Sequence, residues 1–164
     1  MIRNEIAYLS LGSNRGRRAE NIRRAISQLR DQPDLRIKAI SSLYETSPVG
    51  FKQPLYLNAA LKIKTSLPPE KLLECLKKIE EDLGRHPGPR WRARTIDLDI
   101  IFYGRRLLRA RNLVVPHPQF RFRRFVLIPL LELSPRLKDP KTKKPIGQIL
   151  ANLTSPDQKV RLKK

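Results

Sequence analysis

The sequence contains a single cysteine, no long apolar stretch and few acidic residues. Cys75 alone cannot form an intrachain disulfide, which fits a reducing compartment. No apolar run approaches the roughly 18 residues that a membrane-spanning helix needs. Residues 1–12 also lack the pattern of a signal peptide. These absences exclude a disulfide-stabilised secreted domain and a membrane-spanning protein, so we expect a cytoplasmic protein.

The shortage of acidic residues makes the chain strongly basic. It has 15 Asp and Glu against 35 Lys and Arg, which gives a net charge of +20. The imbalance is strongest after residue 103, where 16 of the basic residues but only 3 of the acidic ones lie. A basic surface favours nucleic acid, anionic lipid or a phosphorylated small molecule. Charge alone does not distinguish these partners, so nucleic-acid binding stays open on this ground.

The length and apolar content suit a single folded unit. The chain has 164 residues, of which 40% are hydrophobic, enough to bury a core. No repeat, low-complexity tract or flexible linker divides it. We therefore expect one domain over residues 1–164, with a core from about 5 to 135 and a basic, polar C-terminal tail.

Apolar periodicity predicts an alternation of strands and helices. Strands are expected at 5–11, 35–44, 55–65 and 95–102, and helices at 20–30 and 69–83. The order β-α-β-β-α-β is that of a ferredoxin-like α+β fold, an α/β sandwich with helices on one side of a mainly antiparallel sheet. Alternation puts four residues on the buried side of the third strand: Leu57, Ala59, Leu61 and Ile63. A hairpin-like stretch after Gly104 and an apolar helix at 125–133 precede the tail.

The strand at 95–102 carries the strongest chemical signal. Its alternation puts Thr95, Asp97 and Asp99 on one face. The Cα atoms of Asp97 and Asp99 are therefore expected to lie roughly 6.6 Å apart. Two such carboxylates can share divalent cations, and oxygen ligands without a Cys/His cluster favour Mg²⁺. The alternative is a solvated strand face, but aspartate is a poor strand former and like charges repel. We therefore predict a metal site at Asp97 and Asp99.

Arginines precede this strand in a loop punctuated by Gly and Pro. Arg85, Arg90, Arg92 and Arg94 could grip phosphate oxygens through their planar guanidinium groups, or could serve only solubility. Trp91 among them could cover a flat heterocycle or anchor the core. The sequence has no G-x-x-x-x-G-K-[ST] loop, which excludes a Walker-type phosphate cradle.

Polar residues on other elements could complete a site. Tyr56 and Asn58 face opposite to Leu57, and the donors and acceptor of an asparagine match the edge of a pteridine or purine. A structural partner for Asn58 is the alternative. His117 lies between two prolines and precedes Arg121, Arg123 and Arg124, which forms either a phosphate-contacting corner or part of the basic surface.

Six motifs are spread over most of the chain, from about residue 5 to 135. One is Arg90-Trp91-x-x-Arg94-x-x-Asp97-Leu98-Asp99-Ile100, and the stretch from Arg94 to Ile101 is the most specific part of the chain. The others are Gly12-Ser13-Asn14, Tyr44-x-Thr46-x-Pro48, Tyr56-x-Asn58-Ala59-Ala60, Glu80-x-x-x-Gly84-Arg85 and Val115-Pro116-His117. In these motifs and in their order, the chain resembles a known family, the 6-hydroxymethyl-7,8-dihydropterin pyrophosphokinases of folate synthesis.

The resemblance implies a reaction in which ATP donates a pyrophosphoryl group to the hydroxymethyl oxygen of the pterin and AMP is released. It implies catalytic roles for Arg85, Arg94, Asp97 and Asp99, with the two aspartates holding two Mg²⁺ ions. The residues that it implies for pterin binding are Asn14, Thr46, Ser47, Val49, Tyr56, Asn58, Trp91 and Phe125. Those that it implies for ATP binding are Lys77, Glu80, Arg85, Arg94, Ile100, His117 and Arg123.

The chain departs from the family pattern near both substrates. Ser47 and Val49 stand where proline and leucine are common, and Lys77 replaces a frequent glutamine. Other departures lie where ATP-contacting Arg, Thr and Tyr can occur, at Asn112, Val114 and Pro118.

Two other function classes compete with the enzyme. A nucleic-acid-binding protein on a ferredoxin-like sheet needs exposed aromatics on its strands, whereas these strand faces offer Asn58, Asp97 and Asp99 beside Tyr56. An inactive relative is disfavoured by the complete set of arginines and aspartates. We expect a monomer that binds small-molecule substrates, with no membrane and no specific nucleic acid as partner.

Overall fold

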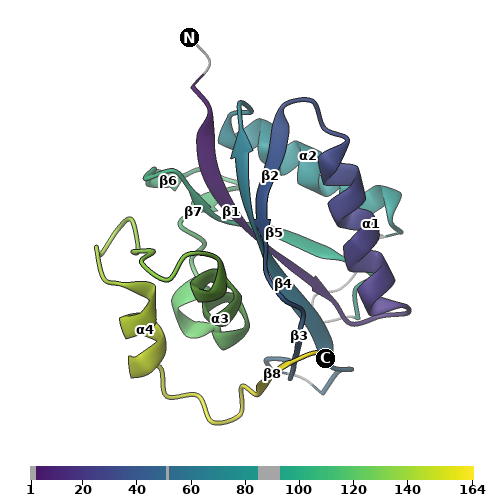
Figure 1. Ribbon diagram of the computed structural model, residues 1–164, viewed down its shortest axis with the longest axis vertical. Coiled ribbons are helices and arrows are strands. Elements are labelled where there is room, and N and C mark those ends of the chain that lie inside the picture. The colour runs from purple at the N-terminus through teal and green to yellow at the C-terminus, as the bar shows by residue number, and fades with distance from the viewer. Residues whose placement is uncertain (1–2, 51, 85–92) are drawn as a thin grey trace.

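The computed structural model describes residues 3–50, 52–84 and 93–164. Its centre is an antiparallel sheet in the order β5-β1-β4-β3-β8, with β2 also paired to β4 (Figure 1). The strands are β1 (Glu5–Ser13), β2 (Leu35–Ile40), β3 (Tyr44–Thr46), β4 (Tyr56–Thr65), β5 (Asp97–Tyr103) and β8 (Val160–Leu162). The order around β1 and β4 is that of a ferredoxin-like core, which confirms the predicted fold class.

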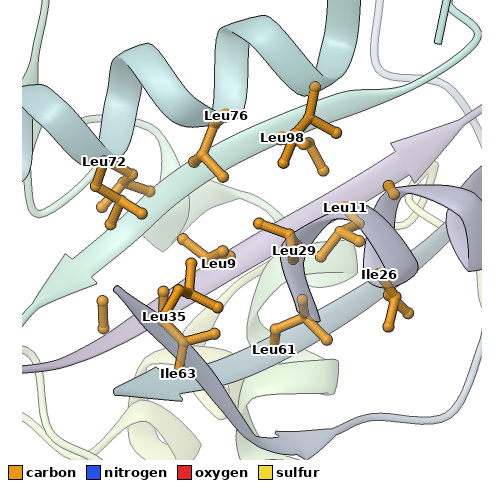
Figure 2. Packing of buried hydrophobic residues seen from close by; sticks show 14 of the residues in the cluster. Leu9, Leu11, Ile26, Leu29, Leu35, Leu61, Ile63, Leu72, Leu76 and Leu98 are labelled. Atoms are coloured by element: carbon orange, nitrogen blue, oxygen red, sulfur yellow. The ribbon is translucent and has the colours of Figure 1, made fainter. Parts of the chain in front are cut away.

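Two helices cover one face of the sheet. They are α1 (Arg18–Arg30) and α2 (Pro69–Asp82). Their apolar stripes pack on Leu9 and Leu11 of β1 and Leu61 of β4, all fully buried (Figure 2). Proline at the first turn of α2 and Gly84 just after it, with φ of +91°, are the start and stop signals that its sequence carries. This layer agrees with the predicted helices.

A second layer lies on the opposite face. It contains the helix predicted at 125–133, which the sequence had not placed on either face. The helix α3 (Arg124–Leu133) packs there with the 3₁₀ turn η1 (Phe120–Phe122) and α4 (Ile146–Asn152) (Figure 1). Their cluster buries Tyr8, Ala60 and Phe102 of the sheet. The prediction of helices on one side was wrong because the strand residues that alternate with those of the first core are also apolar. The second face of the sheet therefore needs a covering layer as well. The sheet is therefore buried on both faces at its centre.

The predicted strand 35–44 is interrupted at Ser41, which hydrogen-bonds to β4 partly through its side chain. Its N–H donates to the Ala60 carbonyl at 2.9 Å, and its Oγ accepts from the Ala60 N–H at 2.8 Å. A register shift between Ile37 and Ala39 precedes this exchange. The chain then resumes as β3, which pairs with the other end of β4.

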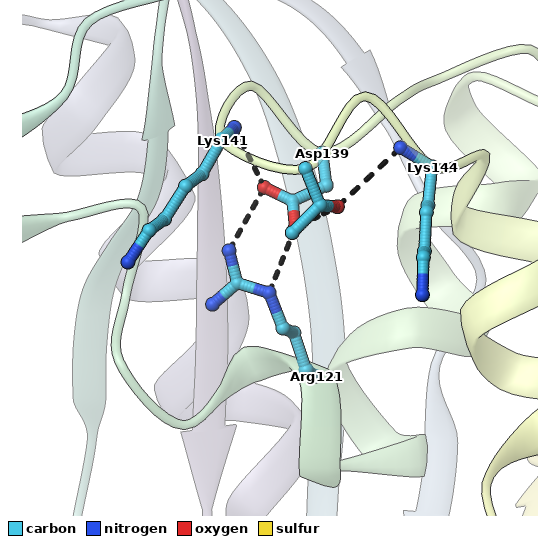
Figure 3. Close-up of polar contacts among 5 residues, drawn as sticks. Arg121, Asp139, Lys141 and Lys144 are labelled. Carbon is cyan, nitrogen blue, oxygen red and sulfur yellow. Dashed lines mark hydrogen bonds and ion pairs between the residues drawn. The ribbon is translucent and has the colours of Figure 1, made fainter.

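The residues after β5 form more structure than a tail. The strands β6 (Leu108–Arg109) and β7 (Val114–Val115) make the expected hairpin. Farther on, β8 pairs with β3, which extends the sheet. Figure 3 shows Asp139 between α3 and α4, where its fully buried carboxylate accepts two hydrogen bonds from Arg121, at 2.7 and 2.9 Å. The C-terminal third is thus tied to the sheet and to η1.

No helix in the described part of the chain is long and apolar enough to cross a membrane.

Candidate active site

The two carboxylates predicted to bind metal lie on the sheet face that α3 partly covers. Asp97 and Asp99 are half-buried on β5, and they pair in register with Gly12 and Ser10 of β1. The Arg94 guanidinium donates to Asp97 Oδ2 at 3.1 Å. Among the described residues no cluster of three or more His, Cys, Asp or Glu could hold a metal. A pair of carboxylates nonetheless suits Mg²⁺, which keeps several waters and binds substrate phosphates.

A row of paired residues links these carboxylates to the predicted pterin residues. Asp97 pairs with Gly12, Gly12 with Asn58, and Asn58 with Tyr44 of β3. Two strand spacings separate Asp97 from Asn58, about 10 Å between their Cα atoms. The row therefore has a carboxylate at one end and an amide at the other, on the same face of the sheet.

Gly12 leaves room for the Asn58 amide within this row. A Cβ at position 12 would lie 2.7 Å from Asn58 Oδ1, far inside ordinary contact. The strand β1 continues through Ser13, beyond the predicted end at residue 11, so Gly12 belongs to the strand. The sequence signal for this role was a glycine inside an alternating pattern, which marks close approach to a strand.

Asn58 and Thr46 form the buried polar end of the row. Asn58 Nδ2 donates to Thr46 Oγ1 at 2.6 Å, and both side chains are almost fully buried. Tyr56 begins the same strand β4, and Ser47 follows Thr46 at the end of β3. Val49 is exposed in the loop beyond. The structure thus brings the predicted pterin residues of two strands together.

Asn14 ties the end of β1 to two neighbouring segments. Its Oδ1 accepts from the Arg94 N–H at 2.7 Å, and its Nδ2 donates to Gln53 Oε1 and the Pro54 carbonyl at 3.2 and 3.4 Å. The side chain is almost fully buried. Its polar atoms hold the backbone that carries Arg94, which is an indirect way of shaping the site.

His117 and Arg123 bring nitrogen groups to the carboxylate end. The pKa of His117 falls to about 4 because of burial and the Arg123 guanidinium, which Asp97 only partly opposes. His117 is therefore neutral at pH 7. Its Nδ1 accepts from the Gln119 N–H at 3.1 Å, so the ring proton is on Nε2. Such a neutral donor beside a guanidinium suits contact with phosphate oxygens.

Phe125 lies on the first turn of α3, next to Arg123. The Arg123 guanidinium lies over its ring, 5.6 Å from the centroid. The ring is half-buried. The start of α3 therefore contributes one residue predicted for ATP and one predicted for the pterin.

Glu80 and Ile100 lie behind β5 rather than on the carboxylate face. Glu80 is almost fully buried on α2, and its Oε1 accepts from the Leu98 N–H at 2.7 Å. The Ile100 side chain is buried in the core between the sheet and α2. The Glu80 carboxylate thus contacts the main chain of β5, and the Ile100 side chain belongs to the core.

Lys77 lies apart from the aspartates, on the exposed side of α2. It lines a surface depression of about 530 Å³ together with Asn112. Two of the departures from the family pattern are therefore neighbours in space. Arg85 and Trp91, which the sequence also predicted for the site, lie outside the described residues.

Comparison with known proteins supports the family that the sequence motifs suggest. The family model for 7,8-dihydro-6-hydroxymethylpterin-pyrophosphokinase matches residues 8–135. The chain belongs to this family.

Two curated members of the pyrophosphokinase family show how similar the chain is to it. It is 44% identical over 140 residues to the 2-amino-4-hydroxy-6-hydroxymethyldihydropteridine pyrophosphokinase of Bacillus subtilis (strain 168), covering 85% of this chain and 84% of the relative. It is 43% identical to the protein of the same name from Aquifex aeolicus (strain VF5), covering 86% and 88%. The predicted family is thus confirmed, and nothing supports the nucleic-acid-binding alternative.

A solved structure shares the fold. The chain is similar to Plasmodium falciparum HPPK-DHPS A437G with SDX-DHP, with a TM-score of 0.75 and 17% identity. The likeness covers 97% of this chain and 49% of that one, so the chain spans about half of that protein.

Proposed function

We propose that this chain transfers a pyrophosphoryl group from ATP to the hydroxymethyl oxygen of 6-hydroxymethyl-7,8-dihydropterin, a step of folate synthesis. The observation that supports the proposal is the row Asp97–Gly12–Asn58, which has a carboxylate and an amide on one sheet face. We propose that the carboxylate end binds metal and that the amide end binds the pterin. The pterin hydroxyl oxygen attacks the β-phosphorus of ATP, and the bond from that phosphorus to the α–β bridging oxygen breaks. AMP leaves with the bridging oxygen, and the hydroxyl proton passes to solvent.

The carboxylate end would bind ATP through Mg²⁺ and phosphate contacts. Asp97 and Asp99 would hold two Mg²⁺ ions, which when bound neutralise phosphate charge and make the attacking hydroxyl more acidic. Arg94, now paired with Asp97, can turn its guanidinium to a phosphate oxygen. His117 and Arg123 would contact phosphate from the other side, and Arg85 would do so from the segment before Arg94. Lys77, Glu80 and the main chain of Ile100 would face the nucleoside.

The amide end would bind the pterin. One N–H of the Asn58 amide donates to Thr46. The same amide also has a carbonyl oxygen and a second N–H, which would bind the edge of the heterocycle. The aromatic rings of Tyr56 and Phe125 would form flat walls, with Trp91 closing the site. Ser47 and Val49 would border it, and Asn14 would act by holding Arg94 in place.

Several narrower points belong to the same proposal. We infer a monomer of one domain, located in the cytoplasm, whose substrates are ATP and the pterin. A requirement for Mg²⁺ is part of the proposal. Binding of a specific nucleic acid is not.

The direct test is AMP release. The protein is incubated with ATP, MgCl₂ and 6-hydroxymethyl-7,8-dihydropterin, and AMP is followed by ion-exchange chromatography. We expect AMP in a one-to-one ratio with pyrophosphorylated pterin, abolished by EDTA or by omitting the pterin. Absence of pterin-dependent AMP would overturn the proposal.

Substitution of one carboxylate tests the metal end separately. Asp97→Asn should lower kcat by about 100-fold or more, because metal-held phosphate positioning is lost. Equilibrium binding of the pterin should stay within about twofold. The matched control is Asp82→Asn, an exposed aspartate on α2 that pairs only loosely with Lys78 at 3.7 Å. Normal turnover of Asp97→Asn would exclude the metal role.

A further inference from the structure

The segment 157–159 joins two walls of the proposed pterin site, although it lies outside the residues 8–135 that the family model matches. It comes directly before β8, which pairs with β3 so that Val160 faces Thr46 (Figure 1). We name residues 157–159 the C-terminal brace. Its neighbours on the two sides are the chain after Thr46 and the start of α3.

On the first side, the brace makes three hydrogen bonds with Ser47. The Ser47 hydroxyl donates to the Asp157 carbonyl at 2.8 Å and accepts from the Lys159 N–H at 2.9 Å. The Ser47 N–H donates to the Lys159 carbonyl at 3.0 Å. The hydroxyl and the main chain of Ser47 are thus both held, one residue after the buried Thr46.

On the second side, Gln158 holds the start of α3. Its Oε1 accepts from the Arg124 N–H at 2.9 Å, and its Nε2 donates to the Phe122 carbonyl at 2.8 Å. Arg124 is the first residue of the helix, where an N–H lacks a partner within the helix. The local cap residue, Arg123, makes no side-chain capping bond. Gln158 supplies that cap from 34 positions farther along the chain.

The two anchors come from three consecutive residues, so a short stretch of chain links the two walls. One anchor fixes the wall that contains Thr46, and the other fixes the turn that carries Arg123 and Phe125. We propose that Gln158 is a positioning residue for the pterin, because it sets the distance between these walls. The inference rests on the proposed function for the identity of the ligand. The bond pattern predicts an effect on the pterin end that exceeds the effect on the ATP end.

The test compares Gln158→Met with a matched control. Methionine keeps the length and most of the bulk of glutamine but neither hydrogen-bonding group. The control is Gln148→Met, at an exposed glutamine of α4 in the same C-terminal region. Both variants are measured for thermal midpoint, for KM of each substrate, for kcat, and for pterin affinity by fluorescence titration without ATP.

We expect Gln158→Met to raise the Kd and KM for the pterin by about 5- to 20-fold, the effect of losing one or two hydrogen bonds that order a site. The KM for ATP should change by less than about twofold. Gln148→Met should match the wild type. Gln158→Glu, which keeps an acceptor for the Arg124 N–H at a helix N-terminus, should recover part of the pterin affinity.

A double substitution tests whether the brace acts as one unit. Ser47→Ala removes the hydroxyl anchor alone. If both anchors serve one spacing, Ser47→Ala with Gln158→Met should weaken pterin binding by less than the product of the single effects.

Two results separate failure of the inference from failure of the proposed function. A lower thermal midpoint in Gln158→Met with unchanged pterin Kd, or equal rises in both KM values, would show that the brace serves stability alone. A wild-type protein that neither binds the pterin nor releases AMP would overturn the proposed function, and the inference with it.

Discussion

Gly12 lies between Asp97 and Asn58, the two ends of the candidate site, and its lack of a side chain leaves room for the Asn58 amide. Its neighbours across the sheet are Asp97 on one side and Asn58 on the other, and a Cβ at position 12 would lie only 2.7 Å from Asn58 Oδ1. Glycine weakens a strand interior, so its presence here has a packing reason. At the residue scale, the site depends on this absence as much as on its polar groups.

We therefore predict that Gly12→Ala damages the pterin end specifically. The new methyl group must displace the Asn58 amide, which breaks its geometry with Thr46. The pterin KM should rise by about tenfold or more, while the free energy of unfolding falls by about 1–3 kcal/mol, as for overpacking. Steady-state kinetics and chemical denaturation measure the two effects.

Gly147→Ala provides the control for that substitution. A Cβ at position 147 of α4 would lie 3.8 Å from Leu131 Cδ2, an ordinary contact. Its kinetics should equal those of the wild type. An unchanged pterin KM in Gly12→Ala would contradict the steric argument.

Between elements, one carboxylate links α3 to β3, the strand that carries Thr46, and to the segment just before it. Glu132 of α3 accepts from the Ser42 N–H at 2.9 Å, from the Ser42 hydroxyl at 2.7 Å and from the Tyr44 hydroxyl. Tyr44 is the β3 partner of Asn58. Burial alone would raise the pKa of Glu132, but these hydrogen bonds hold it below its usual value. The contact orients α3 against β3.

The same contact predicts alkaline sensitivity. Burial, and then the Glu132 carboxylate, raise the pKa of Tyr44 to about 12. A raised pKa means that the stabilisation is complete below the unfolded value near 10 and is lost as the pH rises through about 12. The difference in unfolding free energy between wild type and Tyr44→Phe should therefore shrink over this interval.

The measurement is denaturation of both proteins from pH 8 to the highest pH at which each stays folded. Absorbance titration should show one phenolate fewer near pH 12 in Tyr44→Phe. A difference in stability that does not vary with pH would contradict this assignment of the pKa.

Across the whole molecule, the Arg121–Asp139 pair joins η1 to the chain between α3 and α4 (Figure 3). The Asp139 carboxylate also accepts from the Lys141 N–H at 2.9 Å and the Thr142 hydroxyl at 2.7 Å. Burial would raise the pKa of Asp139, but Arg121, Thr142 and the Lys141 N–H outweigh it and lower the pKa. This satisfied carboxylate stabilises the layer that carries the start of α3.

Asp139→Asn should lower the free energy of unfolding at pH 7 by about 3 kcal/mol, because it leaves Arg121 without its charge partner. A lowered pKa means that the stabilisation is present above about pH 4 and is lost as the pH falls through the folded value. The gap between wild type and Asp139→Asn should therefore close in acid. Urea denaturation at pH 7 and below pH 4 measures it, with exposed Asp82→Asn as control. A gap that stays constant into acid would argue against the ion pair.

Local patterns were sufficient for the strands β1, β4 and β5, for the helices α1 and α2, and for the position of the two aspartates on β5. Alternation put Asp97 and Asp99 on one strand face, since side chains repeat every two residues whatever the strand packs against. Helical spacing located α1 and α2, because helix side chains repeat every 3.6 residues, and an apolar run indicated α3. The family motifs then suggested roles for residues that periodicity leaves unassigned.

Relations between distant segments required the folded chain. The row from Asp97 to Asn58 depends on the register of the three strands β5, β1 and β4. The α3 layer depends on the apolar residues of the sheet face opposite α1 and α2. The polar sequence 157–159 contains no periodic signal, yet it contacts Ser47 and Arg124. Such contacts depend on which chain segments fold next to each other. A local sequence pattern does not determine which distant segment will be the neighbour.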